Sequence, residues 1–587
     1  MYSDKTNINL LTALLVAYGV RHAVVCPGSR NAPIVHNMEV CPDIRCYPVT
    51  DERSAGFYAL GLALHSAQPV AVCVTSGTAL LNLSPAVAEA AYRHLSLVVI
   101  SADRPAAWID QLDGQTLVQP GAFGTLVRCS VSLPEPHDDT ERWHCRRLVC
   151  EALYRCTYRQ PAPVHINVPV TEPLFAFTTP QLPAVSAVGA VTPPPMTDSQ
   201  LAQCYAPLIS GMSRAHRPMI VVGQLPLCEA AASRLAALSD RVVTLCEPLS
   251  CTEGGTPFDE VLHALHGCDG ALRPDRVVYL GDTVVSKRLR RFLRESGAPT
   301  CLLTADGSRW ADPTMHLTEV AECSSPDEAA RLLTLMAQAA PADDRTAADR
   351  QQFAADWHEA LECARKTSES YDPPYSQMAA VKYFEEQTDD LDGSVLVHYA
   401  NSSAIRLANI YARHYVWCNR GVNGIEGSLS TAAGFSLLAE DDSLVFCIIG
   451  DLSFFYDQNA LWNRNLNGRL RIILLNNRCG GIFRQLKGLG DSPAAGSLVE
   501  ANHRTEAQGI CTQNDIGYLS ATDTVGMQTG IVTLLTRRAD RPMLLEVFTD
   551  ADADAGAVAE YYRRVKERLA DRTYRTGTTT DNTQPTT

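Results

Sequence analysis

Short runs rich in Val, Ile and Leu alternate along the chain with longer segments whose apolar residues follow a helical period. A short apolar run bounded by turn residues is typical of a buried strand, and strands that alternate with helices form parallel sheets. The sequence therefore predicts an α/β protein whose parallel sheets are flanked by helices. The strand-like runs occupy residues 22–30, 69–77, 95–105, 162–170, 218–226, 241–249, 275–282, 299–307, 394–403, 414–421, 443–451, 471–477 and 543–550.

The runs fall into three blocks, which we interpret as three domains. Between the first two blocks lies a Pro-rich segment that is typical of a linker. An Ala-rich and charge-rich stretch before the third block predicts a helical connection, and the Thr-rich end lacks an apolar pattern and is predicted to be a disordered tail. The predicted parts are domains at 1–178, 199–340 and 373–571, a linker at 179–198, a connection at 341–372 and a tail at 572–587.

Composition narrows the class of protein. A net charge of −15 argues against a general binder of nucleic acid or of anionic membranes. The 20 cysteines are scattered without paired CxxC motifs, which favours reduced thiols in a cytoplasmic enzyme over a disulfide framework or a zinc site. The polar start, residues 1–9, does not resemble a signal peptide, and no apolar run approaches the ~18 residues of a membrane span.

Two neighbouring apolar runs end in oxygen-bearing side chains. Asp451 closes one run, and Asn476-Asn477 close the next. Neighbouring parallel strands bring their last side chains to one crevice, so the Asp451 carboxylate and the Asn477 amide oxygen can share one hard cation. The alternative is a buried strand pair with ordinary polar ends.

The spacing of these residues resembles the diphosphate and metal motif of thiamine-diphosphate-dependent enzymes. Gly450-Asp451 is followed by 24 residues and then Asn476-Asn477, with Leu452 where many members carry a second glycine. The resemblance implies thiamine diphosphate with Mg²⁺ or Mn²⁺ as cofactors. The third protein ligand to the metal would be the backbone carbonyl of Cys479, whose sulfur is expected to point away because it is a poor magnesium ligand. If position 479 requires positive φ, cysteine would introduce strain that glycine avoids.

The same resemblance identifies the first block as a pyrimidine-binding domain and the third as the diphosphate-binding and metal-binding domain. In this family a glutamate of the first domain hydrogen-bonds the pyrimidine ring and promotes the proton transfer that activates the cofactor. Glu52 stands just past a predicted strand and before a predicted helix, and it matches that residue, although alone it is better explained as an acid at a helix start. The other matched cofactor positions are Thr75, Ser76, Gly77, Gly424, Ile425, Gly450, Leu452, Asn477, Ile482 and Phe483. Ile425 and Phe483 could also be ordinary core residues.

Further motifs narrow the resemblance. CPGSRNAP, TDERSAGF, TSGTALLNL, SADRP, the GQT at 114–116, the SKRL that contains Lys287, and NRGVNGIEGS resemble the 2-succinyl-5-enolpyruvyl-6-hydroxy-3-cyclohexene-1-carboxylate (SEPHCHC) synthases of menaquinone biosynthesis. These transferases decarboxylate 2-oxoglutarate on thiamine diphosphate and add the resulting four-carbon carbanion to isochorismate by conjugate addition, without releasing pyruvate. The alternatives are another thiamine-dependent decarboxylase or carboligase, or a noncatalytic metabolite-binding protein on the same fold.

Basic residues support a substrate that carries carboxylates. Several follow apolar runs, where ligand sites of parallel sheets form, and a guanidinium can bind a carboxylate with roughly 1.5 to 3 kcal/mol per well-made contact. Any one of them alone is better explained as a solvated surface charge. Matched to the family, the substrate residues are Ser29, Arg30, Arg104, Gln115, Lys287, Arg288, Ser402, Arg406, Arg420, Phe483 and Leu486. Of these, Ser402 and Arg406 share one helical face and are assigned to 2-oxoglutarate, and Arg30, Arg104, Gln115 and Lys287 to isochorismate. This division is a hypothesis from the resemblance, and exchanging the two sets would not contradict the sequence.

The resemblance also implies a homodimer or homotetramer, because Glu52 and the diphosphate-binding domain are expected to meet across a subunit boundary. The dispersed histidines, such as His398, form no metal-binding motif and are interpreted as structural.

Overall fold

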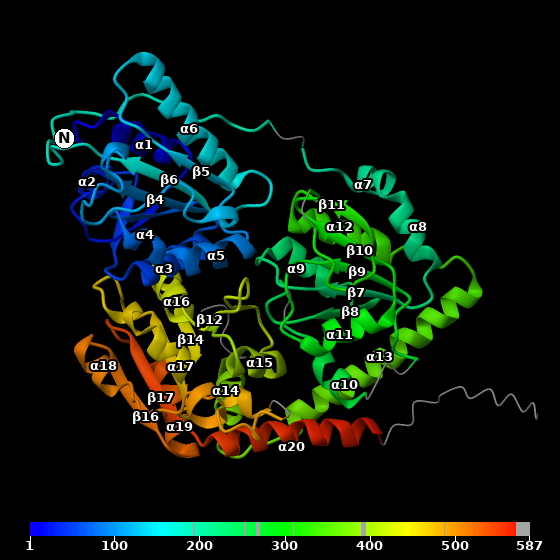
Figure 1. The fold of residues 1–587 in the computed structure, drawn as a ribbon. Helices are drawn as coiled ribbons and strands as arrows, with labels where there is room; N and C mark the ends of the chain where they lie inside the picture. The colour runs from blue at the N-terminus through cyan, green and yellow to red at the C-terminus, as the bar shows by residue number, and fades with distance from the viewer. Residues whose placement is uncertain are drawn as a thin grey trace, which may run out of the picture. The chain divides into compact units, whose positions relative to one another are not determined.

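The structure is a computed structural model, which describes residues 1–191, 194–251, 254–265, 270–308, 310–388, 395–485 and 488–570. Its strands form three sheets in which every paired strand is parallel. This confirms the predicted α/β class (Figure 1). Every helix in the described part of the chain is too short or too polar to span a membrane. The predicted tail, residues 572–587, lies outside the described residues.

Two compact units divide the chain. The first joins Met1–Pro194, Tyr375–Ala408 and Val416–Ala555, and the second joins Pro195–Pro374, Asn409–Tyr415 and Gly556–Thr587. The first unit combines segments from both ends of the chain, so this division does not test the domain limits predicted above. Those limits stay a prediction.

The first unit contains two six-stranded sheets. The first sheet has the order β2-β1-β3-β4-β6-β5. Its strands are β1 His22–Val25, β2 Arg45–Pro48, β3 Val70–Val74, β4 Leu97–Asp103, β5 Cys129–Ser132 and β6 Val164–Pro169. Its helices are α1 Thr6–Ala17, α2 Ala32–Val40, α3 Glu52–Ser66, α4 Thr78–Asn82, α5 Ser84–Tyr92 and α6 Asp139–Thr157.

The other sheet of this unit has the order β13-β12-β14-β15-β17-β16. Its strands are β12 Val395–Tyr399, β13 Val416–Trp417, β14 Leu444–Gly450, β15 Leu470–Asn476, β16 Gly517–Ala521 and β17 Met543–Phe548. The helices of this part of the chain are α14 Gln377–Thr388, α15 Ser403–Tyr411, α16 Ser428–Ser436, α17 Asp451–Tyr456, α18 Gln508–Gln513, α19 Thr524–Thr536 and α20 Ala551–Ala570. Central strands such as β15 are buried along their whole length, as expected for strands covered on both faces.

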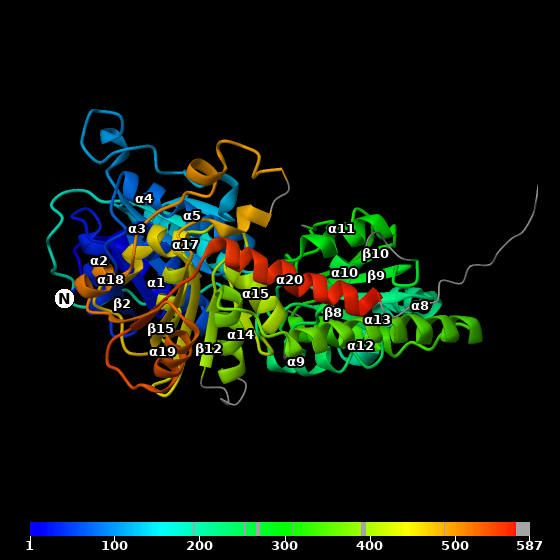
Figure 2. The ribbon, with the colours of Figure 1, turned by 90° about the horizontal axis from the view of Figure 1, so that it is seen from below.

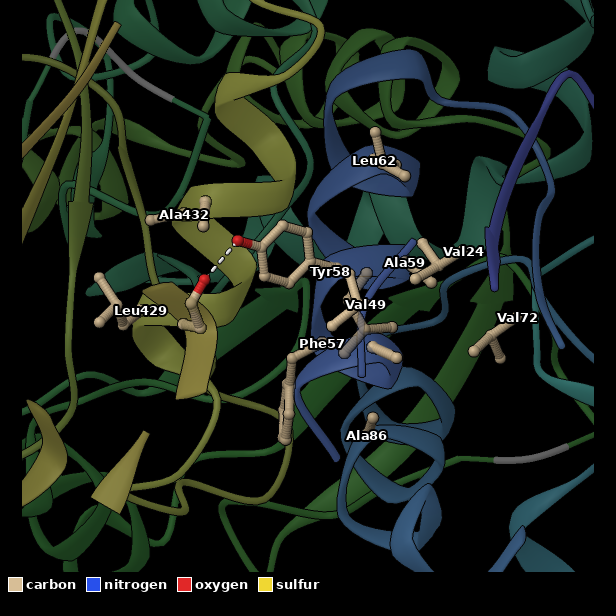
Figure 3. Close-up of a cluster of buried hydrophobic side chains, with 14 of the residues drawn as sticks. Val24, Val49, Phe57, Tyr58, Ala59, Leu62, Val72, Ala86, Leu429 and Ala432 are labelled. Atoms are coloured by element: carbon tan, nitrogen blue, oxygen red, sulfur yellow. Dashed lines mark hydrogen bonds between the residues drawn. The ribbon is translucent and has the colours of Figure 1, made fainter. Parts of the chain in front are cut away.

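Helices α3 and α16 pack against each other and join the two sheets of the first unit into one core. A Cβ on Gly61 would lie 2.1 Å from the Thr431 carbonyl oxygen, and a Cβ on Gly434 would lie 2.3 Å from the Tyr58 carbonyl oxygen. Glycine at both positions therefore permits the close approach of the two backbones. Figure 3 shows the buried side chains around this contact, where the Tyr58 hydroxyl donates to the Ala460 carbonyl at 2.5 Å.

The second unit is built around a five-stranded sheet of order β11-β10-β9-β7-β8. Its strands are β7 Pro218–Val222, β8 Val243–Cys246, β9 Arg276–Leu280, β10 Thr300–Thr304 and β11 Leu317–Glu322. Its helices are α7 Asp198–Cys204, α8 Ala206–Arg214, α9 Glu229–Ala236, α10 Phe258–Ala264, α11 Lys287–Ser296, α12 Pro326–Ala337 and α13 Asp344–Ser370. Helix α13 ends beside α20, where the Tyr371 hydroxyl donates to the Ala557 carbonyl at 3.0 Å (Figure 2).

Candidate functional site

The predicted metal ligands lie together at the carboxyl ends of β14 and β15. These strands are neighbours, and Gly450 pairs with Leu475, so Asp451 and Asn476 follow at the same level. Asp451 is 3% exposed, and its Oδ2 accepts a hydrogen bond from the Cys479 backbone N–H at 3.2 Å. The Cys479 Sγ lies 3.7 Å from Asn477 Oδ1. The loop after β15 therefore touches both predicted oxygen ligands.

The orientation of the Asn477 amide follows from its partner. Asn477 Nδ2 donates to Asp554 Oδ2 at 2.9 Å, so Asn477 Oδ1 is the acceptor that faces the Cys479 thiol. The same Asp554 oxygen accepts from the Thr549 hydroxyl at 2.8 Å. Burial raises the pKa of Asp554, and the hydrogen bonds from Gln377 N–H, Asn477 and Thr549 oppose that rise. A carboxylate oxygen and an amide oxygen are ligands that suit Mg²⁺.

The loop geometry corrects two expectations about position 479. The left-handed residue is Arg478, with φ of 64°, so Cys479 carries no positive-φ strain. The prediction that the thiol points away from the metal ligands is wrong, because the turn buries the side chain and brings Sγ beside Asn477 Oδ1. Burial raises the pKa of this thiol to about 11, so it is neutral at pH 7.

His503 lies beside these ligands, and it belongs to no motif that could have revealed it. Its Nε2 is 3.4 Å from Asp451 Oδ2, and its Nδ1 accepts from the Thr505 backbone N–H at 3.1 Å. Because Nδ1 is an acceptor, Nε2 carries a proton and is a donor. This Nε2 is buried and has no hydrogen-bond partner among the described residues. An unpaired buried donor next to two oxygen ligands fits a site for a metal ion and a bound anion such as a diphosphate.

A second part of the site surrounds the glycine-rich loop after β13. Asn401 fixes this loop, since its Nδ2 donates to the carbonyls of Asn419 and Gly424, each at 2.7 Å. The buried Arg420 donates from Nη1 to Asn401 Oδ1 at 3.1 Å. Ile425 is 40% exposed, so it is not a core residue of this chain. The predicted substrate residues of the next helix are close in sequence to Asn401, with Ser402 half-buried and Arg406 exposed.

Glu89 of α5 supports the same loop and was not predicted. Its buried carboxylate accepts the backbone N–H of Gly421 at 2.8 Å through one oxygen and that of Val422 at 2.8 Å through the other. Burial raises its pKa, and Arg93 and the two backbone donors oppose that rise. The contact joins residues that are 332 and 333 positions apart, so no local pattern could reveal it.

Glu52 begins α3, as predicted from the run before it. The helix is capped by Asp51, whose side chain accepts from the Ser54 N–H at 3.1 Å and from Asn459 Nδ2 at 2.7 Å. The Glu52 carboxylate accepts from Asn82 Nδ2 at 3.2 Å. Cys26, at the end of β1, is close enough that the charge of Glu52 contributes to raising the pKa of its thiol, although burial is the larger cause.

The remaining predicted residues of the first sheet follow β1, β3 and β4. The loop before Ser29 packs against the end of β3, where a Cβ on Gly28 would lie 2.3 Å from Thr75 Cβ. Gly77, with φ of 87°, approaches Gln115 so closely that a Cβ would lie 3.2 Å from its Cα. The structure thus brings together Thr75, Ser76 and Gly77 with the loop of Gln115.

The two predicted arginines of this sheet are both partly engaged. Arg30 is buried, donates to the Val170 carbonyl at 3.2 Å and forms an ion pair with Glu172 at 3.3 Å. Arg104 faces Asp113, with Nη1 and Oδ1 3.6 Å apart.

Of the remaining predicted residues, two belong to the second unit and two to the loop after β15. Lys287 is exposed at the start of α11 in the second unit, and Arg288 is bound there by Asp259 and lies over the Tyr562 ring. Ile482 and Phe483 belong to a short 3₁₀ helix, Gly481–Gln485, in the loop after β15. Leu486 lies outside the described residues.

Comparison with known protein families identifies the class. Residues 6–122 match the model "Thiamine pyrophosphate enzyme, N-terminal TPP binding domain", and residues 400–546 match "Thiamine pyrophosphate enzyme, C-terminal TPP binding domain". The chain is therefore a thiamine-diphosphate enzyme, a class that uses this cofactor with a divalent metal.

Curated relatives narrow the class to one family. A protein of Bacteroides thetaiotaomicron named 2-succinyl-5-enolpyruvyl-6-hydroxy-3-cyclohexene-1-carboxylate synthase is 41% identical, over 97% of this chain and 100% of the relative. Proteins with the same name from Bacteroides fragilis and Phocaeicola vulgatus are 42% and 40% identical, over 96% and 97% of this chain and 100% of each relative. The chain belongs to the 2-succinyl-5-enolpyruvyl-6-hydroxy-3-cyclohexene-1-carboxylate synthase family.

Proposed function

We propose that this protein decarboxylates 2-oxoglutarate and adds the remaining four-carbon unit to isochorismate, which would give the product after which its relatives are named. The observation that carries this proposal is the arrangement of Asp451, Asn477 and His503 at the ends of β14 and β15. When bound, thiamine diphosphate supplies the nucleophilic carbon at which a 2-oxo acid loses carbon dioxide.

In this proposal the sheet formed by β12 to β17 holds the cofactor's diphosphate and metal. Asp451, Asn477 Oδ1 and the Cys479 carbonyl hold Mg²⁺ or Mn²⁺, and Gly450 and Leu452 lie beside them. The exposed Ile425 and Gly424 support the cofactor from the glycine-rich loop, and Ile482 and Phe483 form an apolar wall. A low-polarity wall favours loss of carbon dioxide, since it stabilises an uncharged product state over a charged one.

The first sheet supplies proton transfer and acceptor binding. Glu52 is the catalytic acid that holds a proton at the cofactor's pyrimidine ring, with Thr75, Ser76 and Gly77 beside it. Arg30, Arg104 and Gln115, together with Ser29, bind the carboxylates and hydroxyl of isochorismate. Ser402, Arg406 and Arg420 bind 2-oxoglutarate, because Arg420 and Ser402 both lie next to Asn401. Lys287 and Arg288 of the second unit remain predicted substrate residues.

We further propose that the working protein is at least a dimer. Large apolar side chains of the first unit are exposed near the predicted site loops: Trp108, Leu112 and Val118 by 55%, 101% and 62%, and Val422 by 51%. Large exposed apolar side chains favour coverage by another chain where they lie together. A second copy is the occupant that the family's shared sites imply.

The oligomer is tested by mixing two inactive variants, Glu52→Gln and Asp451→Ala. If each site combines Glu52 of one subunit with Asp451 of another, hybrid dimers regain one intact site of two. Absence of recovered activity, with subunit exchange verified by mass, would count against shared sites.

The reaction itself is tested by following the loss of isochorismate absorbance with thiamine diphosphate and magnesium. We expect consumption with 2-oxoglutarate and none with pyruvate, because pyruvate lacks the distal carboxylate for Ser402 and Arg406. Consumption with pyruvate would favour another carboligase, and cofactor binding without turnover of either acid would favour a metabolite-binding protein.

Free thiols at the described cysteines support a reducing compartment such as the cytoplasm.

A further inference from the structure

A fully buried amide lies directly behind two of the proposed site loops. Gln119, in the segment between β4 and β5, is 0% exposed. Its Oε1 accepts the backbone N–H of Gly77 at 2.8 Å. Its Nε2 donates to the Ala102 carbonyl at 3.1 Å and to Asn167 Oδ1 at 2.8 Å. The Gln119 side chain thus hydrogen-bonds to the Gly77 loop and to strands β4 and β6.

Asn167 of β6 continues the connection to Arg104. Asn167 is 1% exposed, and its Nδ2 donates to Asp103 Oδ2 at 2.8 Å. The other carboxylate oxygen, Asp103 Oδ1, accepts the backbone N–H of Arg104 at 2.8 Å. An unbroken series of hydrogen bonds therefore runs from Gly77 through Gln119, Asn167 and Asp103 to Arg104.

The direction of these hydrogen bonds is fixed by the residues beneath them. Ser101 Oγ donates to Asn167 Oδ1 at 2.8 Å, so it accepts from His165 Nε2 at 2.7 Å. Burial lowers the pKa of His165 to about 4, so the ring is neutral at pH 7 and carries its one proton on Nε2. His165 Nδ1 is then free to accept from the Ser130 hydroxyl at 3.3 Å. With these donors in place, the Asn167 amide cannot turn without losing contacts on both sides.

At the end of this series, the Asp103 carboxylate lies close to two cationic residues, Arg104 and Arg30. Asp103 is buried, which raises the pKa of its carboxyl, while Asn167, the Arg104 N–H and the charge of Arg30 lower it. Arg30 is itself buried and close enough to act on Asp103. The position of the Asp103 carboxylate therefore influences the backbone of Arg104 and the field around Arg30.

We propose that Gln119 and Asn167 are positioning residues for the acceptor substrate, which hold the Arg104 backbone and the Gly77 loop in one fixed relation. Gly77 in turn backs Gln115, the other proposed isochorismate contact. This inference rests on the proposed assignment of Arg104 and Gln115 to isochorismate. Neither residue touches substrate, so their effect is exerted through Arg104 and through the Gly77 loop.

The first test replaces each amide by an apolar side chain of similar size, Gln119→Leu and Asn167→Leu. We expect the KM for isochorismate to rise about tenfold and the KM for 2-oxoglutarate to stay within about twofold. A matched control is Asn37→Leu, because Asn37 is also fully buried and hydrogen-bonded, to Ser3 N–H and Asn9, and contacts neither loop. The control is expected to lower the melting temperature comparably and to leave both KM values unchanged. An equal rise of both KM values in the Asn167 variant would overturn the positioning role.

A double-mutant cycle separates this inference from the assignment on which it rests. If Asn167 acts through Arg104, Asn167→Leu adds little to the isochorismate KM in an Arg104→Ala background, whereas independent roles multiply to about a hundredfold. Multiplied effects would overturn the inference. If Arg104→Ala alone leaves the isochorismate KM unchanged, the assignment of Arg104 has failed instead.

Discussion

The carboxyl of Asp457 provides a sharp test of how burial sets stability in the first unit. Asp457 follows α17 and is 0% exposed. It accepts the backbone N–H and the hydroxyl of Ser430 in α16, each at 2.7 Å. Burial raises its pKa to about 7, although the Ser430 bonds and the charge of Arg53 oppose the rise. The contact between α16 and α17 therefore contains a group that titrates near neutral pH.

The sign follows from where the proton is held. In the unfolded chain an Asp carboxyl loses its proton near pH 3.9, whereas the folded protein retains it up to about 7. The folded state binds more protons in this window, so its stability is full at low pH and falls as the pH rises through about 7. A shift of about three pKa units corresponds to a loss on the order of 4 kcal/mol.

The perturbation is Asp457→Asn, which keeps the shape and cannot ionise. We expect the melting temperature of the variant, relative to that of the wild type, to rise by several degrees between about pH 4 and about pH 8. Asp441→Asn is a suitable control, because Asp441 is exposed and pairs with Arg469 on the surface. A melting difference for Asp457→Asn that is constant with pH would refute the reasoning, as would a wild type that gains on the variant at high pH.

Three other changes have defined outcomes. Gly61→Ala places a Cβ against the Thr431 carbonyl and should lower the melting temperature by an amount equivalent to ~1–3 kcal/mol, whereas Gly556→Ala, which meets nothing within 4 Å, should not. Magnesium with thiamine diphosphate should raise the melting temperature of the wild type; Asp451→Ala should lose this shift, and a retained shift would contradict its role as a ligand. Glu89→Gln leaves one acceptor for two backbone donors and should raise the KM for 2-oxoglutarate roughly tenfold, with no change if the glycine-rich loop holds its shape unaided.

The fold was predictable where strands are buried on both faces. Central strands such as β4 and β15 are continuous apolar runs, and each was found from the sequence alone. Strands β5, β11 and β16 were missed, and all three are edge strands with polar or alternating residues. An edge strand buries less apolar surface, so its sequence resembles that of a loop.

The site was predictable only at the ends of strands. Asp451 and Asn477 stand out because each follows directly on an apolar run. The residues that support the candidate site do not stand out, since His503 and Asp554 beside these two and Glu89 beside the glycine-rich loop contact partners far away in sequence and belong to no motif. The position of a residue after a strand indicates that it can meet a ligand. The residues that support it from behind are brought there by tertiary packing, which no local sequence pattern shows.

The supporting residues differ chemically for a reason that the structure makes explicit. Asp554 faces three donors, the Gln377 N–H, Asn477 Nδ2 and the Thr549 hydroxyl, so only a carboxylate satisfies them all. Asn167 faces two donors and one acceptor, which a single amide matches. The choice of acid or amide then fixes what the site presents. Because Asp554 accepts the hydrogen bond from Asn477 Nδ2, the Asn477 amide presents its oxygen to the proposed cation. A substitution at Asp554 should therefore alter the metal affinity although it replaces none of the proposed ligands.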